Sequence, residues 1–193
     1  MRKAQWLWFA IASLLLSGCS LPRLIDSDVN SFRGSAAAVS GVGYRFERLP
    51  SQTQGTRQAQ IEEMAVVALA RAGLERDKEP VRYAAQLSLQ TDTLVRSTSE
   101  RALRGGYFLP DGTYVRRPLA MPDPPWYRFK VSLLLRDTSN GQLAYETHAV
   151  HEGPWSDIGN LLPPILEAAL RDYPNPPLGP RKFVIELPGD SRP

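Results

Sequence analysis

Alternating apolar and polar residues predict that much of this chain is β-strand. In residues 82–90, Tyr83, Ala85, Leu87 and Leu89 share one face, and polar residues occupy the other. Successive side chains of a strand point to opposite faces, so this pattern predicts a strand with one buried face. Similar patterns predict strands at residues 24–32, 44–49, 127–136, 143–149 and 183–187, the first of them being the weakest.

The strands at 127–136 and 143–149 are joined by Asn140-Gly141, a dipeptide typical of β-hairpin turns. A tight two-residue turn would place Leu135 opposite Glu146. A longer turn, with Gly141 as a left-handed bulge residue, would place Leu135 opposite Tyr145. A slip of one residue moves every side chain to the other face. We choose the second register because it gathers the apolar residues on one face: Leu133 and Leu135 with Leu143, Tyr145, Thr147 and Ala149.

A first helix is predicted at residues 57–72, where the apolar residues fall at helical spacing. Thr56 is expected to cap its start, and Gly73 to supply the left-handed residue that ends it. The stripe of apolar residues at i, i+3, i+4, i+7, i+8 and i+11 indicates one core-facing side; it consists of Ile61, Met64, Ala65, Ala68, Leu69 and Ala72.

A second helix is predicted at residues 164–173, after an irregular first turn from Asp157. Proline interrupts a helix interior but suits the first turn, where no amide partner is needed. The helix is therefore placed to start at Pro163-Pro164, and Pro174 is expected to end it.

The order of elements is two strands, a helix and a strand, followed by the same series again. This order predicts an α+β fold, with a mixed, mostly antiparallel sheet covered on one face by two helices. The two series suggest two ββαβ halves, although their residues do not align. Residues 19–193 are long enough for a single domain with a sizeable core.

The N-terminus has the pattern of an export signal. Arg2 and Lys3 precede an apolar run at residues 6–16, which is far below the ~20 residues that span a bilayer. Leu16-Ser17-Gly18-Cys19 resembles a bacterial lipobox, which implies removal of residues 1–18 and lipids on Cys19. Ser20 follows that cysteine, a context that implies the periplasmic side of the outer membrane.

Composition excludes several classes of protein. Cys19 is the one cysteine, so no disulfide can form within a single copy. The net charge is +3, and Arg2 and Lys3 account for two of those charges. The mature chain therefore lacks the basic field expected of a nucleic-acid-binding protein, and we predict no nucleic-acid partner.

No catalytic, cofactor or metal motif is recognisable, and we predict that the chain is not an enzyme. There is no Gly-x-Ser-x-Gly element. His148 and His151 are three residues apart on one strand, which sends them to opposite faces, so no metal site is predicted. Glu146 shares a face with His148 and could orient it as a base, but a surface hydrogen bond is the commoner outcome.

An insertion at about residues 97–125 interrupts the pattern of strands. Asp111-Gly112, between two apolar triplets, predicts a small hairpin within it. Long insertions in compact domains are often functional, and arginine with aromatic residues suits anionic head groups, sugars or a protein surface. The alternative is that the aromatic rings merely pack on the sheet. The predicted binding residues are Arg101, Arg104, Tyr107, Tyr114, Arg116, Arg117 and Trp126.

The chain resembles a family of proteobacterial lipoproteins known as domain of unknown function 4136. The resemblance implies a small exported α+β domain on a lipid anchor, and it implies no activity or catalytic residue. It spans the mature chain and is carried by the lipobox, Tyr44-Arg45-Phe46, Ala85-Gln86-Leu87-Ser88-Leu89, Leu135-Arg136-Asp137-Thr138 with Gly141 and Gln142, and Ala168-Ala169-Leu170-Arg171-Asp172-Tyr173-Pro174.

The leading hypothesis is a non-enzymatic outer-membrane lipoprotein that binds an envelope protein through the insertion. The alternative is a carrier that holds an anionic lipid or a glycan with its Arg/aromatic cluster, without a cofactor. An apolar pocket beneath the hairpin would favour the carrier, whereas a flat exposed aromatic patch would favour the protein partner. A hydrolase would need a cleft that joins Glu146, His148 and a serine.

Overall fold

The computed structural model describes residues 23–53, 56–94, 106–116 and 125–187. A 3₁₀ turn at Pro50–Gln52 precedes the first helix. The described residues contain two α-helices, α2 (Arg57–Arg71) and α4 (Ile158–Leu170). The strands are β1 (Arg23–Arg33), β2 (Val42–Phe46), β3 (Leu74–Arg76), β4 (Val81–Leu94), β5 (Gly106–Phe108), β6 (Tyr114–Arg116), β7 (Trp126–Asp137), β8 (Leu143–Gly153) and β9 (Arg181–Leu187).

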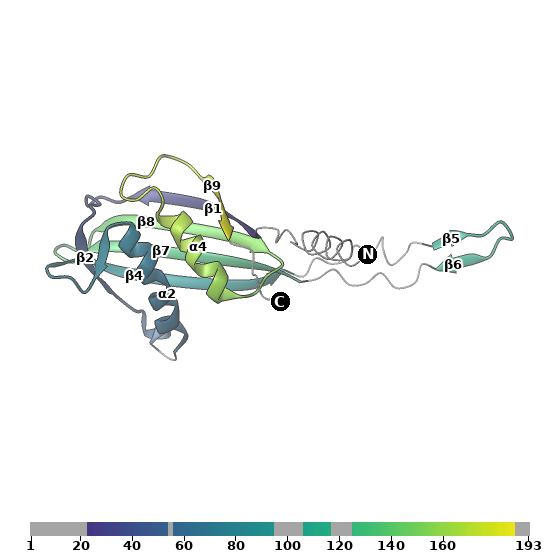
Figure 1. Ribbon diagram of the computed structural model, residues 1–193, viewed down its shortest axis with the longest axis horizontal. Helices are drawn as coiled ribbons and strands as arrows, with labels where there is room; N and C mark the ends of the chain where they lie inside the picture. The colour runs from purple at the N-terminus through teal and green to yellow at the C-terminus, as the bar shows by residue number, and fades with distance from the viewer. Residues whose placement is uncertain (1–22, 54–55, 95–105, 117–124, 188–193) are drawn as a thin grey trace, which may run out of the picture.

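Seven strands form one sheet in the order β3-β2-β4-β7-β8-β1-β9. β2 is parallel to β3 and β4, and the other pairs are antiparallel. Helices α2 and α4 cover the same face, which we call the covered face; the opposite face is the open face (Figure 1). The predicted α+β fold, a mixed and mostly antiparallel sheet under two helices, is confirmed.

The two ββαβ series use different connections. In the first, α2 leads from β2 to the short strand β3, and β2 lies between β3 and β4, parallel to both. In the second, α4 leads from β8 to β9, but β1 lies between those two strands. The N-terminal strand therefore completes the C-terminal half of the sheet, which explains how a weakly patterned segment becomes an interior strand.

The core lies between the covered face and the two helices. Alternate residues of each strand point into it, as the period-two pattern predicts. Leu133 is fully buried. Leu89 was predicted to lie on the buried face of its strand, but its side chain is only half-buried. The largest fully buried side chains are Tyr44, Tyr83, Tyr145, Phe129, Ile25, Leu69, Leu74, Leu87, Leu133, Leu135, Leu161 and Leu162.

The longer-turn register of β7 and β8 is confirmed. Leu135 lies opposite Tyr145, and Gly141 has a φ of +71°. The register shifts just beyond Leu135, where Arg136 pairs with Leu143. Leu143 is consequently half-buried, and Ala144 is buried in its place.

The helix ends differ from prediction in three respects, one of which is that α4 ends at Leu170 rather than at Tyr173. Gly73 is left-handed, with a φ of +82°, as expected, but the Thr56 side chain makes no capping hydrogen bond to α2. Helix α4 begins at Ile158, so Pro163 and Pro164 lie inside it rather than in its first turn. Asp157 explains the earlier start, because its carboxylate accepts a hydrogen bond from the Gly159 amide at 3.0 Å.

Candidate functional site

Strands β5 and β6 form a hairpin of their own, and Figure 1 shows it apart from the seven-stranded sheet. Its turn is built as the sequence predicts. Gly112 has a φ of +82°, and the Thr113 amide donates to the Asp111 carboxylate at 2.9 Å. That hydrogen bond holds the pKa of Asp111 below its ordinary value. The Leu109 amide donates a hydrogen bond to the Thr113 carbonyl at 2.9 Å, which closes the loop.

Two aromatic rings are exposed on this hairpin. Phe108 lies opposite Tyr114, and the ring centroids are 5.0 Å apart with a tilt of 57°. Phe108 is 71% exposed and Tyr114 is 49% exposed, so both rings present much of their surface to solvent. Leu109, next in the chain, is also exposed. The described part of the hairpin therefore carries a small exposed apolar patch.

The other predicted binding residues are only partly described. Arg101, Arg104 and Arg117 lie outside the described residues, as does the predicted lipid site, Cys19. Tyr107 and Arg116 lie on the two hairpin strands, opposite Val115 and Gly106, but their side chains are not described. Trp126 is not on the hairpin; it begins β7, opposite Leu94, and is half-buried. The structure thus brings Tyr114 together with Phe108, which was outside the predicted set.

A hydrogen-bonded chain of three side chains lies on the open face. His148 Nε2 is 2.7 Å from the Glu146 carboxylate, and His148 Nδ1 is 2.8 Å from the Ser132 hydroxyl. With the Nε2 proton donated to Glu146, Nδ1 accepts from the serine. The hydrogen bond between Glu146 and His148 was expected from the sequence. The contact with Ser132 could have been predicted too, since the chosen register places Ser132 opposite His148.

His151, by contrast, is buried on the covered face with 1% exposure, so the two histidines do point to opposite faces. Its Nδ1 donates to the Asp26 carbonyl at 2.6 Å, which fixes the ring at the end of β8. Among the described residues, no three His, Cys, Asp or Glu side chains gather in a group that could hold a metal.

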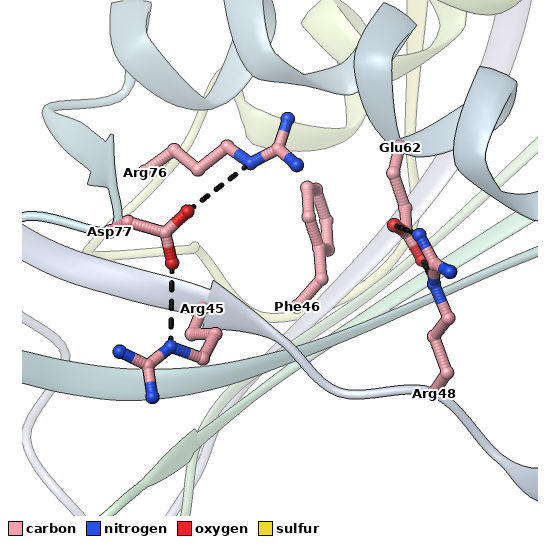
Figure 2. Close-up of a pocket in the computed structure, with 6 residues that line it drawn as sticks. All are labelled: Arg45, Phe46, Arg48, Glu62, Arg76 and Asp77. Atoms are coloured by element: carbon pink, nitrogen blue, oxygen red, sulfur yellow. Dashed lines mark hydrogen bonds and ion pairs between the residues drawn. The ribbon is translucent and has the colours of Figure 1, made fainter.

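A polar pocket at the β2 edge of the sheet has no counterpart among the sequence predictions. Figure 2 shows Arg45, Arg48 and Arg76 around Phe46, in a pocket of about 350 Å³. Arg48 forms two hydrogen bonds, 2.8 and 2.5 Å long, to the buried carboxylate of Glu62.

Acidic side chains neutralise this pocket. Burial opposes ionisation of Glu62, but hydrogen bonds from Arg48 and Gln58 hold its pKa below the ordinary value. Arg45 and Arg76 contact Asp77 at 3.4 and 3.6 Å (Figure 2). Because each guanidinium already has a carboxylate partner, the pocket is a network of ion pairs that joins α2 to the sheet edge.

A second pocket, of about 510 Å³, lies where the C-terminal ends of α2 and α4 meet. Arg71 and Glu167 form an ion pair across it at 2.6 Å. Neither this pocket nor the one at the β2 edge includes a hairpin residue, and neither includes Ser132, Glu146 or His148. In the part of the chain that the structure describes, no helix is long and apolar enough to cross a membrane.

No family model matches the chain, and no curated protein matches it. Among solved structures, the PelC dodecamer from Paraburkholderia phytofirmans is similar at 14% identity; the match covers 75% of this chain and 94% of that chain, with a TM-score of 0.45. A PDZ domain protein from Parabacteroides distasonis is 11% identical over 92% of this chain and 41% of its own, with a TM-score of 0.48. At these identities and TM-scores, neither structure indicates a function.

Proposed function

We propose that this chain is an outer-membrane lipoprotein that acts as a non-enzymatic binding or assembly module in the cell envelope. Lipids on Cys19 hold it on the periplasmic side of the membrane. The β5–β6 hairpin contacts an envelope protein, through the aromatic rings of Phe108 and Tyr114.

The observation that carries this proposal is the exposure of those two rings. Large apolar side chains are normally buried, and aromatic residues are enriched where proteins contact one another. The hairpin pairs with no other strand of the described chain, so its strands are not part of the main sheet. A rigid turn that presents two rings is suited to insertion into a hollow on a partner.

The pockets favour a protein partner over a lipid or a glycan carrier. A carrier needs a cavity next to the residues that recognise its cargo. The two pockets described above are lined by residues of the main domain; ion pairs line the pocket at the β2 edge, and one ion pair, Arg71 with Glu167, lies in the other. The exposed rings of Phe108 and Tyr114 instead lie on the hairpin, outside both pockets.

The chain of Ser132, His148 and Glu146 does not change the proposal. Hydrolysis needs a nucleophile in a site that also stabilises an oxyanion and excludes water. These three side chains lie on the uncovered surface of a sheet, where the neighbouring backbone amides belong to the β-ladder. A surface hydrogen-bond network is the simpler interpretation.

A photo-crosslinking residue at position 108 tests the hairpin contact in intact envelopes. The matched control is position 178, because Leu178 is 104% exposed and lies outside the hairpin. We expect discrete protein adducts from position 108 that are absent from 178 and diminished by Tyr114→Ser. Identical adducts from both positions, or none from 108, would contradict the proposal. Adducts with lipid alone would favour the carrier.

Cys19→Ser tests the anchor independently. We expect the variant to accumulate as unprocessed or soluble protein, because the only thiol that can carry lipid is gone. The measurement is fractionation of the envelope together with the mass of the N-terminal peptide. A variant that still carries lipid and still fractionates with the outer membrane would overturn the assignment.

A further inference from the structure

Strand β9 is an edge of the seven-stranded sheet. Along its seven residues it pairs with β1 on one side, and within the described residues no strand pairs with its other side. Its free backbone groups are therefore available to another strand. Natural edges are often blocked by proline or a bulge, but between Arg181 and Leu187 there is no proline, and the pairing with β1 is regular.

On the open face, β9 carries one cationic and one anionic side chain at equal distances from a central apolar residue. Lys182 and Glu186 flank Val184, which is 55% exposed. Lys182 contacts Asp26 of β1 at 3.2 Å. Glu186 forms no ion pair with any described residue, so one carboxylate on this edge has no cationic partner there.

We propose that β9 pairs with β9 of a second copy of this chain, antiparallel, across a two-fold axis at Val184. In this register Lys182 of each copy lies opposite Glu186 of the other, so two cross-strand ion pairs form and both unpartnered carboxylates are neutralised. On the covered face Phe183 meets Ile185. Two seven-stranded sheets thereby join into one continuous sheet, by an isologous contact of the kind that closes a dimer.

The charge pattern selects this register over its neighbours. Shifting the axis to Phe183 would set Lys182 opposite Val184, and shifting it to Ile185 would set Val184 opposite Glu186. Either shift keeps the same faces together but loses both ion pairs. Charged residues on an edge strand usually repel foreign strands. Here they favour a second copy in one alignment, because only that alignment pairs each charge with its opposite.

Disulfide trapping of the full-length chain in membranes tests the pairing. In Val184→Cys the two thiols face each other across the axis, where directly opposed Cβ atoms are about 4.5–5.5 Å apart. The matched control is Lys182→Cys, on the same face of the same strand. Its two copies would lie about 14 Å apart, four residues at about 3.4 Å each. The unsubstituted chain reports any cross-link through Cys19.

We expect mild oxidation to convert Val184→Cys to a species of twice the mass, reversible by reductant, and to leave Lys182→Cys and the unsubstituted chain unlinked. Equal cross-linking of both variants would indicate random collision and overturn the proposal. Absence of the Val184→Cys dimer would overturn it as well. An adduct of another mass would show that a different protein occupies the edge, which also contradicts it.

Charge changes in the Val184→Cys background test the register. Glu186→Lys replaces two attractions with two repulsions, and we expect about tenfold less cross-linking. Glu186→Gln removes the attractions alone and should give an intermediate loss. The control is Glu47→Lys, since Glu47 is also exposed and forms no ion pair with the described residues. Equal yields in all three variants would overturn the charge-matched register.

Discussion

Two hairpins in this protein have similar turns and different surroundings. In the turn between β7 and β8, Asp137 accepts a hydrogen bond from the Ser139 amide at 2.9 Å, and Gly141 is left-handed. In the turn between β5 and β6, Asp111 accepts one from the Thr113 amide at 2.9 Å, and Gly112 is left-handed. In each turn, a carboxylate accepts the amide two residues ahead and a glycine supplies the positive φ.

Burial separates the two hairpins. β7 and β8 have 12 and 11 residues and lie inside the sheet, with alternate side chains in the core. β5 and β6 have three residues each, and their aromatic pair is exposed. Local chemistry is therefore sufficient to specify a turn, whereas burial decides whether the hairpin supports the fold. A hairpin that does not support the fold is free to present its side chains to a partner.

The largest expected difference between the hairpins concerns their apolar side chains. Leu133→Ala in β7 should lower the free energy of unfolding by about 2–5 kcal/mol, because it leaves a cavity in the core. Leu89→Ala, at a half-buried site, should cost about 1 kcal/mol. Phe108→Ala in β5 should leave the main transition within about 0.5 kcal/mol. Denaturant melts measure all three, and a larger loss for Phe108→Ala than for Leu133→Ala would reverse the comparison.

The turn glycines should differ by a smaller amount. Gly141 and Gly112 both have positive φ, and no atom lies within 4 Å of the position that an alanine methyl group would take. Gly→Ala therefore costs only backbone strain, about 1 kcal/mol. We expect Gly141→Ala to lower the stability of the main transition by that amount. Gly112→Ala should leave the transition unchanged while reducing cross-linking from position 108. An equal loss of stability in both variants would show that β5–β6 folds as part of the main sheet.

The turn carboxylates should differ in their response to acid. Hydrogen bonds from Ser139, together with Arg82, hold the pKa of Asp137 below its ordinary value of 3.8. A depressed pKa stabilises the fold above the unfolded value, and that stability is lost as the pH falls through the folded value. Asp137→Asn should therefore flatten the loss of stability below about pH 4. Asp111→Asn should leave that acid limb of the main transition unchanged, and a matching change would contradict the comparison.

Much of the fold was predictable because burial imposes a period on the sequence. The faces of β4, β7 and β8 follow from alternation, and the need to gather apolar residues on one face selected the register of β7 and β8. The parallel pairing of β2 with β4 was not predictable, because alternation does not name a strand's neighbour. The start of α4 was misplaced because the cap at Asp157 outweighs two prolines in the helix interior.

The candidate site was less predictable for a related reason. Exposed residues carry no periodic signal, so the insertion was recognised from its length, its composition and the Asp111-Gly112 turn, and the predicted binding set left out Phe108, the partner of Tyr114. The polar pocket at the β2 edge was missed because its arginines come from different segments: Arg45 from β2, Arg48 from the segment after it and Arg76 from β3. Only the folded chain brings them together.

The smallest expected effect on stability is the most informative about function. Arg116→Glu with Arg117→Glu reverses two charges of the predicted binding set, and we expect the free energy of unfolding of the main sheet to change by less than about 0.5 kcal/mol. Binding should nevertheless weaken, measured as cross-linking yield from position 108 or as association with liposomes. The loss should be larger at low salt, because exposed charges are less screened there.

A matched control for this double charge reversal is Arg33→Glu with Arg57→Glu, since both arginines are exposed and lie outside the hairpin, at the end of β1 and the start of α2. Binding that is lost equally in both variants would indicate a general charge effect. If the hairpin variant folds normally and binds normally at low salt, then β5–β6 contributes no contact of its own. The exposure of Phe108 and Tyr114 would then have no functional consequence. The two hairpins would differ only in the length and burial of their strands.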